Sequence, residues 1–297
     1  MKNKKIVVLA AAVLGITSNA FGQVVEEHYD DFNAKDFNGC KKCINTDLWG
    51  SSYRNGYNVG DHTKAISGKK LQMNVRGWGD TDDDEGEDNS RIRSVFLDTS
   101  NMKGACFIPS VKKHEIGDCA ANPSHGSVRF RYIGAMYDSN TADDNFEGII
   151  YAWMNFQRHG DSTEKKGVVS VFGTAEMCDD ADCTSYDNWN TYDGVNDPDL
   201  WFGEFKLNNN KNLRACLFLD TATDELVFSF GEEGNEIERR VTTTDHDLPD
   251  TFNNVHPNQE WHTFEARVDV EECNSGPRVN NYVETLVDDV YRVVDDF

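Results

Sequence analysis

Basic residues are scarce in this sequence. Its 297 residues include 29 lysines and arginines against 52 aspartates and glutamates, and the formal net charge is −23. Because nucleic acids and anionic membrane surfaces attract basic patches, this balance argues against both as partners. Long apolar runs are missing too. After the first residues, nothing approaches the roughly 20 apolar residues that a membrane-spanning helix needs, so we expect no membrane insertion.

Linkers and internal repeats are also lacking. The chain has 6 prolines, no segment rich in proline and serine, and no repeat of fixed period. The first 22 residues have the pattern of a secretory signal peptide: lysines, an apolar stretch over 6–16, then small residues at Ala20 and Gly22. We therefore predict a signal peptide over 1–22, a single domain over 23–297, and a secreted protein of the extracellular space, the cell surface or the periplasm.

Strand signals dominate the mature chain. Segments rich in β-branched and aromatic residues are separated by clusters of turn-forming residues, and the expected strands are 127–137, 147–157, 167–177, 214–220, 225–233 and 260–271. The segment 281–294 fits either a helix or a closing strand. Many short strands in one domain imply two stacked antiparallel sheets. The predicted fold is an all-β jelly-roll sandwich with few short helices.

The eight cysteines all lie in the mature chain. An even number in an exported protein favours disulfides, although 105 connectivities are possible. Local pairs are the most economical choice: Cys40–Cys43, Cys106–Cys119 and Cys178–Cys183, which leaves Cys216–Cys273. The pair Cys40 and Cys43 also has the spacing of half a zinc site or of a redox pair, but no second motif completes either one.

Three phrases carry a resemblance to a known superfamily. "EEHYDDFNAKDFNG" (26–39) with "NTDLWG" (45–50) resembles the opening of concanavalin A-like, or laminin-G-like, secreted jelly rolls. "EWHTFEARVDVE" (260–271) with "YVETLVDDVYRV" (282–293) resembles their ending, and "VFGTAEMCDDADC" (171–183) resembles a hairpin of uncharacterised bacterial secreted members. The resemblance implies the fold. It leaves function open, because this fold includes lectins, hydrolases, lyases and structural spacers.

The segment 147–157 supplies the strongest binding candidate. Alternation directs Ile150, Ala152, Met154 and Phe156 to the core and leaves aromatic rings and amides on the opposite face. Sugars stack on aromatic rings and hydrogen-bond to amides. The predicted carbohydrate-binding residues are Tyr151, Trp153, Asn155 and Gln157, flanked by Arg129 and Arg131 if 127–137 pairs with this strand. The alternative is that a loop covers these aromatics as a second small core.

The segment 260–271 raises the question of catalysis. Laminarinase-type enzymes of this fold place three carboxylates at alternate positions of one strand, but here Arg267 stands between Glu265 and Asp269. An arginine between two carboxylates keeps both ionised, which does not suit a general acid. We therefore expect a salt-bridged outer face. Alginate lyases of the same fold use an arginine-rich strand that Arg91 and Arg93 could imitate, but we find no second motif to complete the site.

Two sets of acidic residues are candidates for binding calcium. Asp80, Asp82 and Asp84 have the spacing of the first half of a calcium-binding loop, although the remainder of the EF-hand pattern is absent. The family resemblance implies a second site, because calcium often joins the first and last strands there. The matching residues are Asp31 and either Asp288 or Asp289. A solvated acidic turn and simple turn caps are the alternatives.

These observations lead to three functional hypotheses. The first is a secreted, non-catalytic module, either carbohydrate-binding or surface-structural, that calcium stabilises. The second is a polysaccharide-degrading enzyme, a glycoside hydrolase or a lyase, whose catalytic residues come from distant strands. The third is a subunit of an extracellular assembly that self-associates through strand edges or the acidic loop.

Overall fold

The computed structural model describes most of the region predicted to be the mature chain. The described residues are 23–32, 44–55, 62–78, 87–94, 102–115, 125–137, 146–159, 168–178, 189–193, 200–206, 212–220, 223, 225–242, 263–271 and 280–296. The predicted signal peptide lies outside them. Within these ranges the chain forms sixteen β-strands and no α-helix, and therefore no helix that could cross a membrane.

The strands form two eight-stranded sheets in which every pairing is antiparallel. Sheet 1 has the order β14 (Asn235–Thr242), β13 (Glu225–Glu232), β12 (Leu213–Asp220), β6 (Met102–Glu115), β16 (Asn280–Asp296), β4 (Leu71–Trp78), β3 (His62–Ile66), and β1 (Gln23–Asp30) also pairs with β16. Sheet 2 has the order β10 (Trp189–Asp193), β9 (Val168–Cys178), β8 (Phe146–His159), β7 (His125–Tyr137), β15 (Thr263–Glu271), β5 (Glu87–Arg93), β2 (Ser51–Asn55), and β11 (Trp201–Lys206) also pairs with β9. The predicted all-β sandwich is confirmed, and the ambiguous segment 281–294 is part of strand β16.

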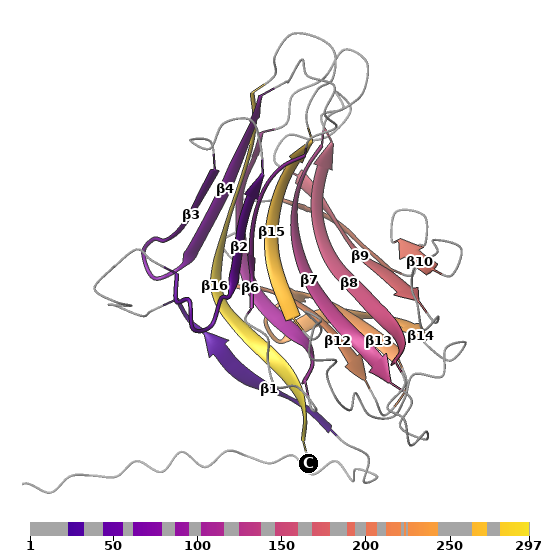
Figure 1. Ribbon diagram of the computed structural model, residues 1–297. Helices are drawn as coiled ribbons and strands as arrows, with labels where there is room; N and C mark the ends of the chain where they lie inside the picture. The colour runs from indigo at the N-terminus through magenta and orange to yellow at the C-terminus, as the bar shows by residue number, and fades with distance from the viewer. Residues whose placement is uncertain are drawn as a thin grey trace, which may run out of the picture.

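The two sheets lie face to face, and the chain crosses from one sheet to the other several times (Figure 1). The chain passes from β6 in sheet 1 to β7 in sheet 2, and from β15 in sheet 2 back to β16 in sheet 1. The first and last strands, β1 and β16, are hydrogen-bonded neighbours. The ends of the described fold therefore hold each other in place.

The alternation predicted from the sequence determines the core. Val128, Phe130 and Tyr132 of β7 are fully buried, as are Ala152 and Met154 of β8, and Phe156 is only 1% exposed. In β15 the buried apolar residues are Phe264, Ala266, Val268 and Val270. Successive side chains of a strand point to opposite faces, so burying one set presents the intervening residues on the outer face of sheet 2.

Aromatic pairs join the two sheets across the core. Phe107 of sheet 1 stacks on Phe130 of sheet 2 with ring centroids 4.5 Å apart, and Phe156 of sheet 2 meets Phe230 of sheet 1 edge to face at 5.2 Å. Gly173 of β9 packs closely against the opposite sheet, since an added Cβ would stand 2.8 Å from the Phe228 ring of β13. Such contacts leave little freedom in how one sheet sits on the other.

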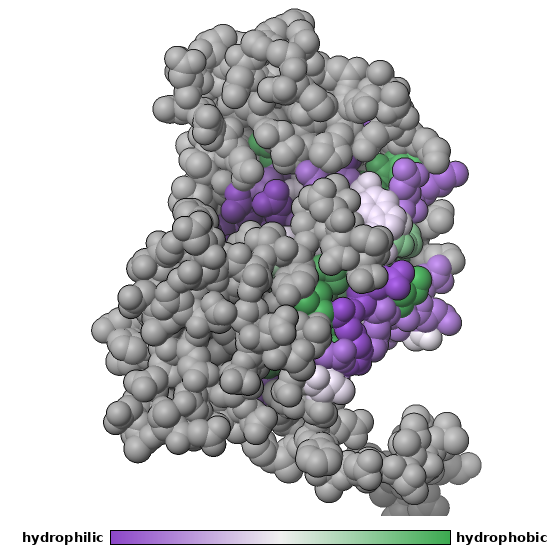
Figure 2. Space-filling model, turned by 90° about the vertical axis from the view of Figure 1, so that its right-hand side faces the viewer, coloured by the Kyte–Doolittle hydropathy of each residue, from purple (hydrophilic) through white to green (hydrophobic). Residues whose placement is uncertain are grey.

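A pocket opens at one edge of the sandwich, among β11, β12, β13 and β14. Its volume is about 420 Å³, and its lining includes Phe205, Lys206, Leu213, Phe230, Glu232 and Ile237. Ile237 is 48% exposed, a high value for a large apolar residue. Figure 2 views the molecule from the side on which β14 and β10 lie, where hydrophobic and hydrophilic side chains alternate in small patches. The sequence analysis did not anticipate this pocket.

The phrase that begins the family resemblance forms a buried anchor after β1. The Asp30 carboxylate accepts a hydrogen bond from the Trp49 indole N–H at 2.7 Å and another from the Phe32 backbone N–H at 2.8 Å. Trp49 is 2% exposed, stacks on Phe32 and meets Phe264 edge to face. Burial raises the pKa of Asp30, and the hydrogen bonds from Trp49 and Phe32 oppose that rise.

The disulfide found in the structure differs from the predicted local pairs. Cys106 of β6 and Cys216 of β12 stand opposite each other in register, with Cα atoms 4.0 Å apart, and form a disulfide. The predicted pairs Cys106–Cys119 and Cys216–Cys273 are therefore wrong. The reason is that adjacent strands bring together two cysteines that are 110 positions apart in the sequence. The predicted pairs Cys40–Cys43 and Cys178–Cys183 involve residues outside the described ranges.

Replacing the anchor residue Trp49 with Phe should lower the free energy of unfolding by about 1–3 kcal/mol at pH 7, because a buried oxygen of Asp30 loses its donor. The folded-state pKa of Asp30 lies above 3.8, so stability from this group falls as the pH rises from 3.8 through the folded-state pKa. Losing the indole donor raises that pKa further, and we expect a larger penalty at pH 7 than at pH 3.5. Urea unfolding of the wild type and the variant at pH 7 and at pH 3.5 measures this difference in the penalty. In an Asp30→Asn background the pH dependence should disappear, whereas a pH-independent penalty would contradict this account.

The disulfide prediction concerns the covalent link itself. A non-reducing digest analysed by mass spectrometry should yield a peptide pair that joins Cys106 to Cys216. Since the link closes a loop of 110 positions, the double variant Cys106→Ala/Cys216→Ala should lose about 4–5 kcal/mol of unfolding free energy. A peptide that joins either residue to Cys119 or Cys273 would refute the assignment.

Candidate functional site

The predicted pairing of segments 127–137 and 147–157 is confirmed, because β7 and β8 are antiparallel neighbours. Trp153 is opposite Arg131, Asn155 is opposite Arg129, and Gln157 is opposite Ser127. The two predicted flanking arginines are therefore in the expected positions. The backbone of Tyr151 lies in the same strand, opposite Ile133, while its side chain lies outside the described part of the structure.

The predicted platform residues differ in how accessible they are. Trp153 and Gln157 are half-buried, and the guanidinium carbon of Arg131 lies 5.5 Å from the centroid of the Trp153 ring, a cation–π distance. Asn155 is only 6% exposed, and its amide donates to the Thr174 hydroxyl of β9 at 3.0 Å. Trp153 and Gln157 therefore remain the better placed to contact a ligand.

Two further aromatic residues continue this surface toward β11. Phe172 of β9 is opposite Asn155, and Trp201 of β11 is in turn opposite Phe172. The rings of Phe172 and Trp201 stack at 6.4 Å with an interplanar angle of 18°, and Trp201 is half-buried. Sequence reasoning missed both residues. The alternation within 167–177 directed Phe172 outward, but only strand pairing could bring Trp201 next to it.

The partners of Glu265 answer the question of catalysis that the segment 260–271 raised. The Glu265 side chain is 1% exposed although it lies on the outer face, and it is opposite Arg131 on one side and Arg93 on the other. The Nε of Arg93 is 3.2 Å from one carboxylate oxygen, and Nη1 of Arg131 is 3.5 Å from the other. Glu265 is therefore held between two guanidinium groups.

Asp269 lies four residues further along β15, on the same outer face, and is held in a similar way. Its side chain is 3% exposed, it accepts a hydrogen bond from Nε of Arg267, and Nε of Arg129 lies 3.8 Å away. Four positions along a strand separate Glu265 from Asp269 by about 13 Å. Retaining glycosidases hold their two carboxyl groups about 5 Å apart and inverting ones about 6.5–9.5 Å apart. The expected salt-bridged outer face is confirmed, and this pair does not fit a glycosidase.

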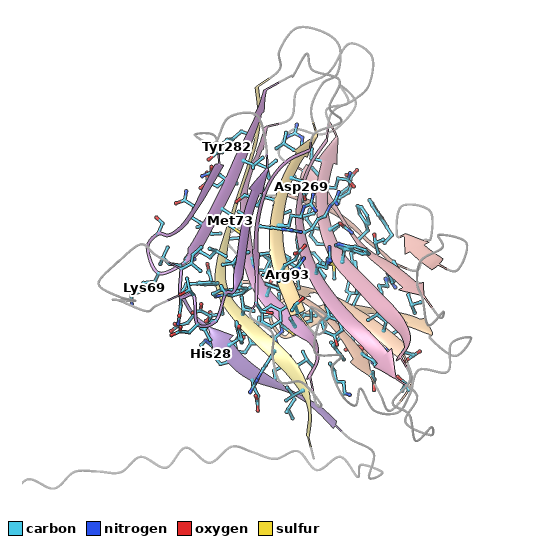
Figure 3. The ribbon with its side chains drawn as sticks, viewed as in Figure 1. His28, Lys69, Met73, Arg93, Asp269 and Tyr282 are labelled. Atoms are coloured by element: carbon cyan, nitrogen blue, oxygen red, sulfur yellow. A yellow bond between two sulfur atoms is a disulfide. The ribbon has the colours of Figure 1, made fainter. Side chains whose placement is uncertain are left out.

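The register of three neighbouring strands also aligns three arginines. Arg267 of β15 is opposite Arg129 of β7 and opposite Arg91 of β5. We call the outward side chains of these strands the arginine face; its charged members are Arg91, Arg93, Arg129, Arg131, Arg267, Glu265 and Asp269. Figure 3 labels Arg93 and Asp269, which lie on the adjacent strands β5 and β15. Like charges directly opposite each other destabilise a sheet, so a row of three arginines is unusual.

On the outer face of sheet 1, several carboxylates surround a single arginine, Arg240. Arg240 of β14 lies 3.0 Å from Asp220, 2.8 Å from Glu225 and 3.0 Å from Glu238. Burial alone would lower the pKa of Arg240, but the hydrogen bonds that its guanidinium donates to these carboxylates raise it above its usual value. Three carboxylates therefore surround this one arginine.

The residues predicted to bind calcium are only partly described. Asp80, Asp82 and Asp84 lie outside the described residues. The last paired residue of β1, Asp30, is opposite Val290 of β16, and Asp31 follows it outside the strand. Asp289 lies 3.6 Å from Nε2 of His28, and Asp288 pairs with Nζ of Lys70 at 2.5 Å. Both alternatives, Asp288 and Asp289, therefore lie in the strand that pairs with β1.

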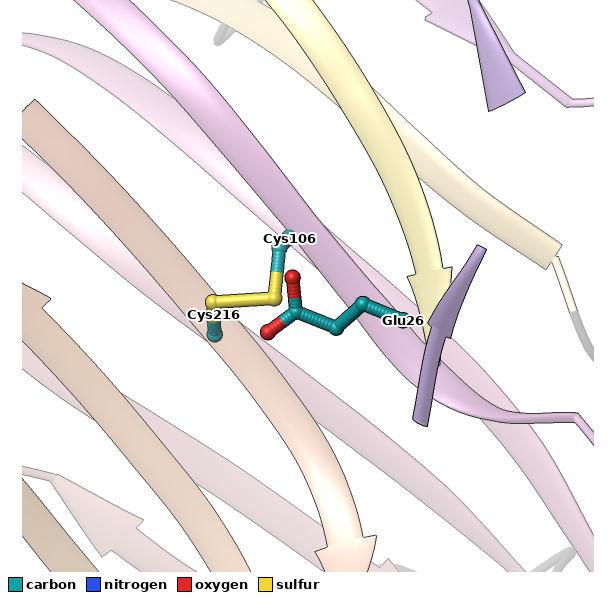
Figure 4. Close-up of side chains that lie close together, drawn as sticks. All are labelled: Glu26, Cys106 and Cys216. Carbon is teal, nitrogen blue, oxygen red and sulfur yellow. A yellow bond between two sulfur atoms is a disulfide. The ribbon is translucent and has the colours of Figure 1, made fainter. Parts of the chain in front are cut away.

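One other cluster in the described residues has the side chains of a metal site. The carboxylate of Glu26 and the sulfurs of Cys106 and Cys216 lie within 4.8 Å of one another (Figure 4). The two sulfurs are bonded to each other, so neither is the thiolate that a metal ion requires. Glu26 also pairs with Arg214. In the oxidised protein this cluster is therefore a structural contact.

The clamp around Glu265 leads to a stability prediction. Glu265→Ala would leave Arg93 and Arg131 in a largely buried position without their shared carboxylate, and the free energy of unfolding should fall by about 3–5 kcal/mol. The matched control is Glu225→Ala in sheet 1, where Arg240 keeps Asp220 and Glu238, so that the loss should be about 1 kcal/mol or less. Chemical denaturation of both variants gives the comparison. Similar small losses in both would show that Glu265 is not clamped.

No family model matches the sequence, and no curated protein matches it. Solved structures that resemble the chain include legume lectins and proteins described as a galactosidase and a pseudo-glucanase. The winged bean acidic lectin, complexed with methyl-α-D-galactose, has 11% identity and a TM-score of 0.37 over 91% of this chain and 99% of its own. The endo-β-galactosidase of Clostridium perfringens that releases GlcNAcα1-4Gal has 10% identity and a TM-score of 0.39 over 94% of this chain and 64% of its own.

A pseudo β-1,3-glucanase of Mycobacterium tuberculosis, also described as an immunostimulatory antigen, has 9% identity and a TM-score of 0.37 over 90% of this chain and 98% of its own. These identities and TM-scores are too low to support a conclusion about the ligand or the activity of this protein. The architecture of this protein is established by its own strand pairing.

Proposed function

We propose that this protein is an exported, non-catalytic carbohydrate-binding module whose ligand lies on the outer face of sheet 2, against Trp153. The single observation that carries the proposal is the position of Trp153. Its half-buried indole is on the outer face, four positions before Gln157 in the same strand and opposite Arg131. An aromatic ring with hydrogen-bonding side chains around it is the combination that sugar-binding sites use.

The neighbouring strands extend this surface in both directions. The half-buried Trp201 continues the aromatic part beyond Asn155 and stacks on the buried ring of Phe172, and the arginine face adjoins Trp153 on the opposite side. Rigid strands hold these groups, so little side-chain entropy is lost on binding. A polysaccharide, which is long and presents apolar and polar edges in turn, matches such an extended surface better than a small ligand does.

Export and calcium are parts of the same proposal. The leader pattern of residues 1–22 supports export, and a buried disulfide such as Cys106–Cys216 suits an oxidising compartment. Asp31 directly follows the end of β1 and Asp289 lies within β16, the strand that pairs with β1, and their carboxylates would supply two of the oxygen ligands of a calcium ion. Such an ion would stabilise the junction of β1 and β16, away from the chemistry of sugar binding.

The test of the proposal is a glycan array probed with and without calcium, followed by titration of the best ligand. Trp153→Ala should weaken binding about tenfold or more, since an aromatic anchor contributes at least 1–2 kcal/mol of binding free energy. The control is Tyr282→Ala, which removes an aromatic side chain from the outer face of sheet 1 (labelled in Figure 3) and should leave the affinity unchanged. If no glycan binds, or if a folded Trp153→Ala variant binds as the wild type does, the proposal fails.

A further inference from the structure

We infer that the reduced form of this protein binds a thiophilic divalent cation such as zinc through the sulfurs of Cys106 and Cys216 and the carboxylate of Glu26. The inference goes beyond the proposed function, because these residues belong to strands of sheet 1, whereas the proposed sugar-binding surface is on sheet 2. Metal binding and the disulfide exclude each other, since both use the same two sulfurs.

The strand pairing of sheet 1 brings the three ligand atoms together. The residues on either side of Cys106 are in the main core, so Cys106 itself is on the outer face, opposite Cys216. Glu26 of β1 is opposite Val293 of β16, and its side chain extends toward the disulfide (Figure 4). The carboxylate and the two sulfurs all lie within 4.8 Å of one another.

This convergence matches the size of a tetrahedral metal site. Zinc binds a thiolate sulfur at about 2.3 Å and a carboxylate oxygen at about 2.0–2.2 Å, so neighbouring ligand atoms around the ion are about 3.5–3.8 Å apart. The three ligand atoms here already lie within a similar span. Once the S–S bond is broken, rotation of the two cysteine side chains therefore brings the sulfurs to coordinating positions without any change in strand register.

The ligand types indicate which cations fit. Two thiolates and a carboxylate are ligands that zinc and other thiophilic ions accept, whereas calcium and magnesium prefer oxygen ligands alone. The Glu26 side chain is 41% exposed, so this side of the cluster is open to water, which completes a four-coordinate site.

An apolar shell surrounds the sulfurs on the other sides. Cys106 is fully buried and Cys216 is 3% exposed, and both pack against Val293, Phe218 and Tyr291. Such a shell keeps water away from the sulfurs and strengthens the attraction between thiolates and a cation. The strands also hold the sulfurs in place before the ion arrives, so little side-chain freedom is lost on binding.

Arg214 provides a compensating positive charge. Its guanidinium pairs with Glu26, its Nε lies 3.8 Å from a carboxylate oxygen of Glu236, and its guanidinium carbon is 5.5 Å from the centroid of the Tyr291 ring. A nearby arginine favours the thiolate form that a metal ion requires. A divalent cation with two thiolates and one carboxylate has a net charge of −1, which Arg214 stabilises. Glu236 retains Arg214 when the Glu26 carboxylate turns to the ion.

Reduction of the disulfide opens the site. A trialkylphosphine supplies two electrons that break the S–S bond, water supplies the two protons of the new thiols, and the oxygen of that water ends on phosphorus as the phosphine oxide. Zinc binding then releases the two thiol protons. The bound ion joins β1, β6 and β12 in place of the disulfide, and it stabilises the folded state because only the folded chain assembles the three ligands.

Glu26→Gln tests the site without altering the sulfurs, because it keeps the size of the side chain and removes the charged ligand. The matched control is Glu27→Gln. Glu27 is the next residue of β1, it is 46% exposed, and it accepts a hydrogen bond from Nε of Arg292 at 2.7 Å. Both substitutions therefore remove one negative charge from an exposed glutamate that pairs with an arginine. The double variant Cys106→Ala/Cys216→Ala removes both sulfur ligands.

The experiment titrates each protein, reduced with the phosphine, with Cd²⁺, because cadmium–thiolate bonds absorb in the ultraviolet. The other six cysteines are present in all four proteins, so their contribution cancels in the comparison. We expect the reduced wild type to bind an extra ion that the double variant and the oxidised wild type do not bind. Glu26→Gln should weaken binding of this ion about tenfold or more, and Glu27→Gln should leave it unchanged. Zinc should also raise the unfolding temperature of the reduced wild type more than that of Glu26→Gln.

Three outcomes would refute the inference. Alkylation and mass spectrometry could show that Cys106 and Cys216 stay bonded to each other under every condition in which circular dichroism shows a folded protein, so that no reduced native form exists. The reduced wild type and the double variant could bind cadmium equally, so that the two sulfurs are not ligands. Glu26→Gln and Glu27→Gln could weaken binding equally, which is an effect of net charge. If the double variant does not fold, the comparison of the two glutamine variants decides.

Discussion

Aromatic packing between the two sheets is the constraint on which the other features depend. Phe107 stacks on Phe130, and Phe156 packs against Phe230, so these rings determine which face of β7 and β8 is buried. The next residue along each strand must then point outward. In this way the apolar core itself places Arg129 and Trp153 on the outer face of sheet 2. A shift of one residue in either strand would bury arginines and expose phenylalanines, which the hydrophobic effect forbids.

The outer faces of the two sheets differ in how their charged side chains are paired. On sheet 1, Arg240 is surrounded by carboxylates in an acidic protein, as its composition favours. On sheet 2, Glu265 and Asp269 are each shared by two arginines, and a buried carboxylate without such partners would be strongly destabilising. The arginines thus stabilise the buried carboxylates.

Sheet 1 supplies the covalent and hydrogen-bonded anchors. The Cys106–Cys216 disulfide joins β6 to β12, and the pairing of β1 with β16 connects the first described strand to the last. The Asp30–Trp49 hydrogen bond then attaches the segment after β1 to the core, where Trp49 meets Phe264 of sheet 2. These contacts hold the scaffold, and the proposed ligand-binding surface is on the outer face of the other sheet, sheet 2.

Local sequence determined the strands, their inward faces and the all-β class, because alternation depends only on the backbone of each strand. It therefore predicted the burial of Phe130 and Phe156, the outward position of Trp153 and the salt-bridged character of 260–271. The tertiary structure alone decided which strands are neighbours. Cys106 pairs with Cys216 rather than with nearby Cys119 because β6 lies next to β12. Arg91, Arg129 and Arg267 form one row because β15 lies between β5 and β7. Strand order and register arise from the packing of the whole chain, and no local pattern contains them.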